Sequence, residues 1–336
     1  MKKLLNTLFV TTQGTYLSRK GEGIQVTVEG EKKLHIPIHT LDGIICFGQV
    51  TCSAPMLGLC GERNVTVSLL SERGRFLARV QGPVSGNVLL RRQQYRLADH
   101  PEQCVEIARA VVVGKVANCR TVLMRGAREA DHADAADALR SGADELKRLL
   151  DGVRQAPGLE ELRGLEGTAS RIYFGVFDHL IRRQKEDFVF RGRSRRPPLD
   201  NINALLSFAY TLLVHGVISA LESVGLDPQV GYLHRDRPGR PSLALDIMEE
   251  FRPVLADRLV LSLINRCQIQ AADFEISTSG AIMMKEKPRK KVLTAWQKRK
   301  ADVVEHPFLE EKLAAGLLPY AQALLLARHL RGDIDG

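Results

Sequence analysis

The spacing of hydrophobic positions along the chain changes near residue 85. Before that point, short β-prone runs alternate with glycine-containing turns, and one short helix is expected at 55–63. Beyond Gly82-Pro83, apolar residues recur at three- and four-residue intervals over long stretches, which is typical of helices. The expected strands cover residues 4–10, 16–18, 24–28, 33–38, 44–47, 65–70 and 75–80.

This change of pattern predicts an α+β fold in two parts. We expect a small β-rich, β-sandwich-like domain at residues 1–85, followed by a larger all-α domain at residues 86–336. The segment at 191–198 reads R-G-R-S-R-R-P-P, and its double proline excludes a continuous helix. We therefore expect an exposed basic loop there, with Asn203 beginning and capping the next helix.

One expected helix, at 159–182, places a carboxylate among apolar side chains. Glu166 lies four residues after Leu162 and three before Ala169, so all three share a face with Tyr173. A lone buried carboxylate costs several kcal/mol unless it is paired or neutralised. The flanking Gly164 and Gly167 are expected to let another backbone or a ligand approach. A core arginine that satisfies Glu166 is the alternative interpretation.

A second group of polar residues follows in the stretch from Gly231 to Phe251. Asp246 and Glu249 are three residues apart, so on a helix they share a face, and His234 precedes them by one turn-forming segment. Carboxylates with one histidine suit Mg²⁺ or Mn²⁺ better than a metal that prefers thiolates. The alternative is a loop histidine beside a solvated helix face.

Charge is concentrated in two segments of the 336-residue chain. Its 48 Lys and Arg residues exceed its 39 Asp and Glu residues by nine. The segment 182–196 has seven basic and two acidic residues, and 285–300 has eight basic residues and Glu286 alone. The remaining sequence is slightly acidic, at −3. Such a distribution indicates a surface that meets polyanions, although a basic solvated helix side is an alternative at 285–300.

Several classes of protein are excluded. Six cysteines form no C-x-x-C pair, so we expect free thiols in a reducing cytoplasm. The start of the chain imitates a signal peptide, but Asn6 and Thr7 interrupt its apolar stretch. No apolar run approaches the ~18 residues of a membrane span, so we expect no membrane partner and a cytoplasmic location.

The metal-ligand candidates and the basic segments together favour phosphodiester chemistry. A divalent ion polarises the phosphoryl oxygen and activates an attacking hydroxyl or water, while Lys and Arg bind the backbone. Trp296, within the second basic segment, is either a stacking platform for a base or a packing anchor.

Taken together, the sequence resembles the CRISPR-associated protein 1 family. The resemblance rests on L-E-G-T-A at 165–169 with Tyr173-Phe174, and on R-P-P at 196–198 before N-A-L-L-S-F-A-Y-T-L-L at 203–213. It continues with G-Y-L-H at 231–234 and L-D-I-M-E-E-F-R-P at 245–253. The stretches at 4–11 and 72–77 also resemble the subtype I-C branch.

The resemblance implies an N-terminal domain for homodimerisation and a helical catalytic domain. It implies that Mg²⁺ or Mn²⁺ is held by Glu166, His234 and a third acid, for which we favour Glu249, with Asp246 as an alternate or supporting acid. DNA contacts are expected from the basic loop, the second cluster and, on its helix, Tyr173. The residues concerned are Arg191, Arg193, Arg195, Arg196, Lys285, Arg289, Lys290, Lys291 and Tyr173.

The implied activity is spacer acquisition in CRISPR antiviral defence. An integrase and endonuclease of this family joins the 3′-hydroxyl of a captured protospacer duplex to phosphodiesters at the ends of a CRISPR repeat. Two homodimers bridged by a dimer of CRISPR-associated protein 2 are the expected assembly on double-stranded DNA. The alternatives are a stand-alone metal-dependent nuclease that cuts branched DNA in repair, and a non-enzymatic DNA-binding scaffold.

Overall fold

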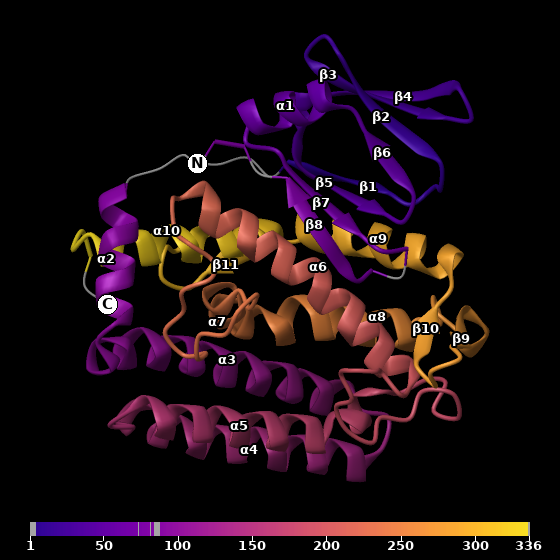
Figure 1. The fold of residues 1–336 in the computed structure, drawn as a ribbon. Helices are drawn as coiled ribbons and strands as arrows, with labels where there is room; N and C mark the ends of the chain where they lie inside the picture. The colour runs from indigo at the N-terminus through magenta and orange to yellow at the C-terminus, as the bar shows by residue number, and fades with distance from the viewer. Residues whose placement is uncertain (1–4, 73, 81, 84–87, 335–336) are drawn as a thin grey trace. The chain divides into compact units, whose positions relative to one another are not determined.

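The computed structural model describes the chain except for residues 1–4, 73, 81, 84–87 and 335–336 (Figure 1). It divides into two compact units, one formed by residues 1–85 with 286–317 and the other by residues 86–285 with 318–336. The predicted strand start at Leu4, Arg73 in the 72–77 stretch and much of the predicted boundary at 81–90 fall outside the described residues.

Two four-stranded sheets build the first unit. One has the order β1-β5-β7-β8 and the other the order β4-β3-β2-β6. The strands are β1 (Asn6–Val10), β2 (Thr15–Lys20), β3 (Gly23–Val28), β4 (Glu31–Pro37), β5 (Leu41–Phe47), β6 (Val50–Cys52), β7 (Thr66–Leu70) and β8 (Phe76–Val80).

The core of this unit is shared by both sheets and by helix α1 (Ala54–Glu62). Leu17 and Ile24 come from one sheet, Ile44 from the other, and Met56 and Leu59 from the helix, and none of these side chains is exposed. Strand β5 pairs in parallel with both β1 and β7, which centres Ile44 in its sheet. The apolar runs in the sequence therefore correspond to the buried faces of two sheets, as predicted.

A late segment of the chain returns to this first unit. It contains α9 (Glu286–Ala301) and the hairpin of β11 (Val303–His306) with β12 (Glu311–Ala314). Gln297 Nε2 in α9 donates a hydrogen bond of 2.8 Å to the backbone oxygen of Thr7 in β1. The expectation that residues 86–336 form one uninterrupted helical domain was wrong for 286–317, because contacts across 290 residues place this segment beside the N-terminal sheet.

The second unit is mostly helical. Figure 1 shows α3, α4 and α5 running side by side, and α3 also contacts α7. Its helices are α2 (Val88–Ala98), α3 (Pro101–Glu129), α4 (Ala133–Gln155), α5 (Leu159–Gly175), α6 (Asn201–Ser223), α7 (Ser242–Phe251), α8 (Arg258–Asn265) and α10 (Leu318–Leu330). A π-helical segment, Arg252–Asp257, joins α7 to α8, and the short hairpin of β9 (Phe274–Ile276) and β10 (Ile282–Met284) was not predicted.

Helix α5 is shorter than its predicted range of 159–182, and helix α6 begins at Asn201, two residues before the predicted start. Helix α5 ends at Gly175, and a 3₁₀ segment, Phe177–Leu180, follows it, although Leu162, Ala169 and Tyr173 are buried as expected. Helix α6 is long and apolar enough to cross a membrane by length and composition, but 61% of its most apolar window is buried inside the protein. It is therefore positioned as a core helix of the second unit.

Candidate active site

Asp246 on α7 holds the loop that carries His234. Its carboxylate accepts hydrogen bonds from the backbone N–H groups of Tyr232 (2.6 Å), Leu233 (3.0 Å) and His234 (3.0 Å). The same carboxylate lies 2.6 Å from His234 Nδ1. Only 1% of Asp246 is exposed, and its oxygens are committed to this loop. Asp246 therefore fixes the ring of His234 and leaves Nε2 to face the rest of the site.

Lys115 on α3 lies between two glutamates. Its ammonium contacts Oε1 of Glu166 on α5 and lies 2.7 Å from Oε2 of Glu249 on α7, and it donates a 2.9 Å hydrogen bond to Ser170. Burial lowers the pKa of Lys115, but the carboxylates of Glu249 and Glu166 outweigh that effect, so its pKa is raised. The ammonium of Lys115 is thus the cation that lies between the carboxylates of Glu166 and Glu249.

Glu249 is the most enclosed acid of the site. Burial alone raises its pKa, but Arg252 and Lys115 oppose this and lower the pKa to about 2. Arg252 Nη1 lies 2.5 Å from Glu249 Oε1, one helical turn further along the chain. Glu249 is therefore ionised at neutral pH although it is buried.

His234 completes the group. Its Nε2 lies 4.0 Å from Glu249 Oε1, on the side of the ring that Asp246 leaves free. Glu166 on α5 and Glu249 on α7 thus share Lys115, and the 231–234 loop places His234 next to Glu249. Their oxygen and imidazole donors are the set that Mg²⁺ and Mn²⁺ accept.

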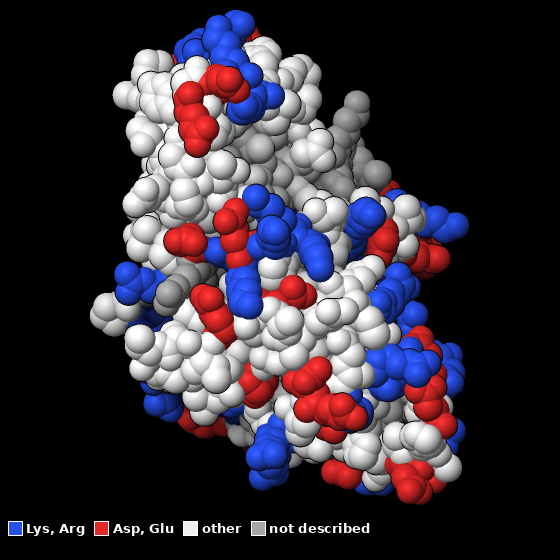
Figure 2. All heavy atoms as spheres, turned by 90° about the vertical axis from the view of Figure 1, so that its right-hand side faces the viewer, with Lys and Arg blue, Asp and Glu red and all other residues white. Residues whose placement is uncertain are grey.

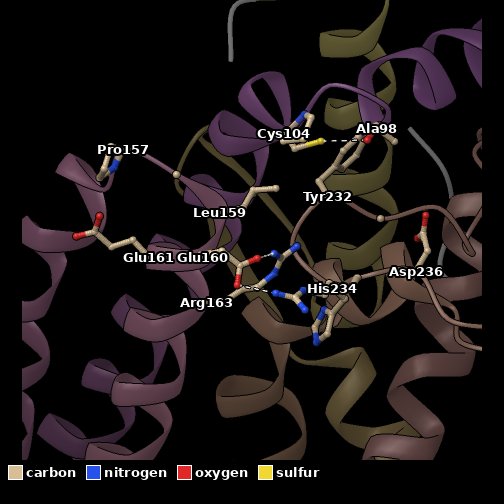
Figure 3. Close-up of a pocket in the computed structure, with 14 residues that line it drawn as sticks. Ala98, Cys104, Pro157, Leu159, Glu160, Glu161, Arg163, Tyr232, His234 and Asp236 are labelled. Atoms are coloured by element: carbon tan, nitrogen blue, oxygen red, sulfur yellow. Dashed lines mark hydrogen bonds and ion pairs between the residues drawn. The ribbon is translucent and has the colours of Figure 1, made fainter.

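A pocket of about 630 Å³ opens beside His234 (Figure 3). Glu160 in the first turn of α5 forms ion pairs with Arg163 and, at 2.7 Å, with Arg235. Arg163 Nε also donates a 2.6 Å hydrogen bond to the backbone oxygen of Leu233. These contacts tie the start of α5 to the histidine loop, and the pocket gives the ring of His234 access to solvent.

No three His, Cys, Asp or Glu side chains within the described ranges are grouped closely enough to hold a metal ion. The physical reason lies in Lys115, whose ammonium separates the carboxylates of Glu166 and Glu249. The donors still fit a divalent ion, because two ionisable carboxylates already share a cation and His234 presents Nε2 next to one of them.

The first basic cluster is a loop in the helical unit. Arg191, Arg195 and Arg196 are exposed, whereas Arg193 is half-buried and donates hydrogen bonds to the oxygens of Ser194 and Asn203. The helix cap at this point is Asp200, whose carboxylate accepts from the N–H of Asn203. The capping role predicted for Asn203 was therefore wrong, and its buried amide instead holds the loop through Gly192.

The second basic cluster forms α9, apart from Lys285, which precedes the helix. Lys285, Lys290 and Lys291 are exposed, but Arg289 is 7% exposed and Trp296 is 6% exposed. Trp296 is thus a packing anchor, one of the two interpretations left open by the sequence. On the face drawn in Figure 2, Lys and Arg side chains gather in groups with acidic side chains beside them.

Tyr173 lies in the core rather than on a surface. It is 1% exposed, and its hydroxyl donates a 3.1 Å hydrogen bond to Asp257. Its ring packs edge-on against Phe174 and Phe177. The structure therefore contradicts its predicted contact with DNA, because its apolar-face position on α5 buries it. A Cβ at Gly164 or Gly167 would meet nothing within 4 Å, so neither glycine accommodates a neighbouring backbone.

Sequence reasoning missed both cations of the site. Lys115 lies among the buried residues Val111, Val112 and Cys119 of α3, and a single lysine on an apolar helical face is a signal for a buried ion pair. Arg252 follows Glu249 by three residues, the spacing of a helical ion pair. The core cation anticipated for Glu166 exists, but it is this lysine rather than an arginine.

The structure defines an α+β protein whose helical unit holds a carboxylate–histidine centre. The family described as CRISPR associated protein Cas1 matches residues 8–298. CRISPR-associated endonuclease Cas1 1 of Chlorobaculum tepidum is 54% identical over 335 residues, covering 100% of this chain and 98% of that protein. The chain belongs to the Cas1 family.

Solved structures agree with this assignment. A Cas1 protein from Thermotoga maritima has a TM-score of 0.83 at 26% identity, and the match covers 97% of each chain. A chain of a partial Cas6-RT-Cas1–Cas2 complex has a TM-score of 0.66 at 25% identity, covering 98% of this chain and 96% of that one. The predicted α+β fold, with a β-rich domain before a mostly helical one, is confirmed.

Proposed function

We propose that the protein is a metal-dependent DNA endonuclease and integrase of CRISPR spacer acquisition. The observation that carries the proposal is that Glu166 and Glu249 share one buried cation and His234 lies next to Glu249, in a chain of the Cas1 family. Relatives named endonucleases at 54% identity over the whole chain support the same activity.

In this proposal Glu166, Glu249 and His234 Nε2 hold Mg²⁺ or Mn²⁺. The ion, when bound, polarises a phosphoryl oxygen and increases the acidity of the attacking hydroxyl. Asp246 orients His234 by accepting from three backbone N–H groups of its loop and facing Nδ1. Lys115 and Arg252 keep Glu249 ionised, so the acid is ready to serve as an anionic ligand at neutral pH.

The proposed reaction exchanges one phosphodiester for another. The 3′-hydroxyl oxygen of a protospacer bonds to a phosphorus at the end of a CRISPR repeat, and the bond from that phosphorus to the 3′ oxygen of the adjoining nucleotide breaks. The attacking hydroxyl loses its proton, and the departing 3′ oxygen takes one up to become a hydroxyl. The pocket beside His234 gives DNA a path to the centre, and the exposed arginines of the basic loop contact its backbone.

The proposed assembly is a homodimer through the β-rich domain, with two homodimers bridged by a dimer of CRISPR-associated protein 2. Similarity to a Cas1 chain solved with Cas2 supports that partner. We further propose a cytoplasmic location, where the DNA substrates lie. The subtype I-C assignment stays a prediction from residues 4–11 and 72–77.

The decisive test is Glu166→Gln, with Glu145→Gln, an exposed glutamate of α4 outside the pocket, as its matched control. We expect transfer of a short duplex into a supercoiled repeat-containing plasmid to fall at least ~100-fold in Glu166→Gln and to be unchanged in Glu145→Gln. Wild-type transfer by a folded Glu166→Gln protein contradicts the proposal. Joining that needs no repeat identifies a repair nuclease, and binding without cleavage in Mg²⁺ or Mn²⁺ identifies a scaffold.

A further inference from the structure

The basic loop and Glu249 are connected by one aromatic ring. The guanidinium carbons of Arg193, in the loop, and Arg252, after α7, each lie 5.1 Å from the centroid of the Tyr210 ring on α6. A guanidinium within about 6 Å of a ring centroid is attracted by the ring's electron-rich face. The basic loop and the segment after α7, almost sixty residues apart in sequence, thus both contact the Tyr210 ring.

The loop end of this connection is firmly held. Arg193 Nη1 donates a 3.0 Å hydrogen bond to the oxygen of Ser194 and another to Oδ1 of Asn203. Asn203 is fully buried, and its side-chain amide donates a 2.8 Å hydrogen bond to the backbone oxygen of Gly192. Arg193 is therefore the arginine that links the basic loop to the Tyr210 ring.

The ring itself is fixed at its hydroxyl. Tyr210 donates a 2.7 Å hydrogen bond to Oδ1 of Asp257, and Tyr173 donates to the other oxygen of the same carboxylate. Asp257 is 1% exposed, within the π-helical segment that begins at Arg252. The Tyr210 ring is thus fixed in the core between two arginines that belong to different segments.

The other end of the connection is the site acid. Arg252 Nη1 lies 2.5 Å from Glu249 Oε1, so this arginine occupies an oxygen that the proposed metal ion needs. Two guanidinium groups beside one ring repel each other. Burial lowers the pKa of Arg193, Tyr210 and Asp257 oppose this, and the like charges of Arg195 and Arg252 lower the pKa further. Removal of either cation from the ring therefore favours the other.

We propose that Arg193, Tyr210 and Arg252 are positioning residues that couple DNA contact at the basic loop to metal binding at Glu249. A phosphate backbone on the loop draws Arg193 away from the ring, Arg252 moves toward the ring, and Glu249 Oε1 is released for the ion. Such coupling is reciprocal, so DNA tightens metal binding by the same factor as metal tightens DNA binding. The inference rests on the proposed function, because it takes Glu249 as a metal ligand.

The test measures Mn²⁺ affinity by calorimetry with and without a saturating short duplex that has dideoxy 3′ ends and cannot react. We expect the duplex to tighten Mn²⁺ binding about fivefold or more in the wild type. Arg193→Gln should reduce the effect below about twofold, because without DNA its Mn²⁺ affinity should already approach that of the DNA-bound wild type. Arg195→Gln removes the same charge from an exposed position of the loop and should keep the effect.

A second pair of variants makes the test independent of the loop. Tyr210→Phe keeps the ring and should keep the effect, whereas Tyr210→Leu removes the ring and should lose it. A wild type without the effect, an Arg193→Gln protein that retains it, or an equal loss in Arg195→Gln overturns the coupling. Mn²⁺ binding by Glu166→Gln in the absence of DNA tests the proposed function separately. If the variant binds Mn²⁺ as the wild type does, the proposed metal site is wrong, whereas the coupling fails only in the measurements with DNA.

Discussion

The two basic clusters look alike in sequence but are built differently. The cluster at 182–196 is irregular chain in the helical unit, and Arg193 anchors it to the Tyr210 ring. The cluster at 285–300 is almost all one helix, α9, in the β-rich unit. In α9 the buried residues are Val292, Leu293 and Trp296 with Pro288 and Arg289, and the exposed basic residues are Lys287, Lys290, Lys291 and Lys298.

This difference shows that equal charge does not imply an equal role. The loop cluster leads through Tyr210 and Arg252 to a buried acid of the site. The α9 cluster pairs with exposed acids, such as Glu286, which lies 3.0 Å from Lys290, and Glu72, 3.5 Å from Arg289. Of the second cluster, only Lys285 belongs to the same compact unit as Glu166 and His234.

The largest expected difference between the two clusters is in stability. It is measured by removing one cation that leads to the buried site and one exposed cation of α9. Arg252→Ala takes one of its two cations from the buried Glu249 and leaves Lys115, and we expect it to lower the free energy of unfolding by about 3 kcal/mol. Lys290→Ala removes an exposed i, i+4 pair and should cost less than about 0.5 kcal/mol. Urea unfolding of both variants measures the difference, and equal losses contradict the distinction drawn between the clusters.

Acid titration sharpens the same contrast. Because the pKa of Glu249 is lowered from 4.5 to about 2 in the folded protein, its contribution to stability is present above pH 4.5 and disappears as pH falls toward 2. The difference in unfolding free energy between wild type and Glu249→Gln should therefore shift by about 3 kcal/mol across that window. A difference that stays constant with pH shows that Glu249 is not held by Arg252 and Lys115.

The smallest expected effect concerns DNA affinity and its salt dependence. Neutralising Arg191, Arg195 and Arg196 to Gln should reduce the slope of log affinity against log salt by up to about three, since each lost phosphate contact contributes about 0.9. The same change at three exposed lysines of α9, Lys287, Lys290 and Lys298, should reduce it less, because Lys290 is already paired. Filter binding over a salt series measures both slopes. A larger reduction of the slope by the α9 variant would show that α9, rather than the basic loop, makes more of the phosphate contacts.

The sequence predicts the local elements well because local spacing determines them. The strands of the first 85 residues and the buried face of α5 follow from short-range periodicity. The assignment of α9 to the first unit does not follow, since it depends on the contact of Gln297 with Thr7. No local pattern encodes a contact across 290 residues.

The candidate site was predictable in part for the same reason. Glu166, His234, Asp246 and Glu249 could be selected because each lies in a conspicuous motif. The division of roles between the last two could not be read from spacing, because it depends on the backbone N–H groups of residues 232–234 that Asp246 satisfies. Lys115 lies 51 residues before Glu166 on another helix, so only the packing of α3 against α5 shows the pair.

The hydrogen bonds of Asp246 have a consequence for how the enzyme matures. The three N–H groups of the histidine loop find their acceptor only after α7 has docked, and α7 also brings Glu249. A growing chain that has folded α3 to α5 but has not yet added α7 possesses Glu166 and no second acid. Under the proposed function, such a chain lacks one of its two acidic metal ligands and should not cut DNA.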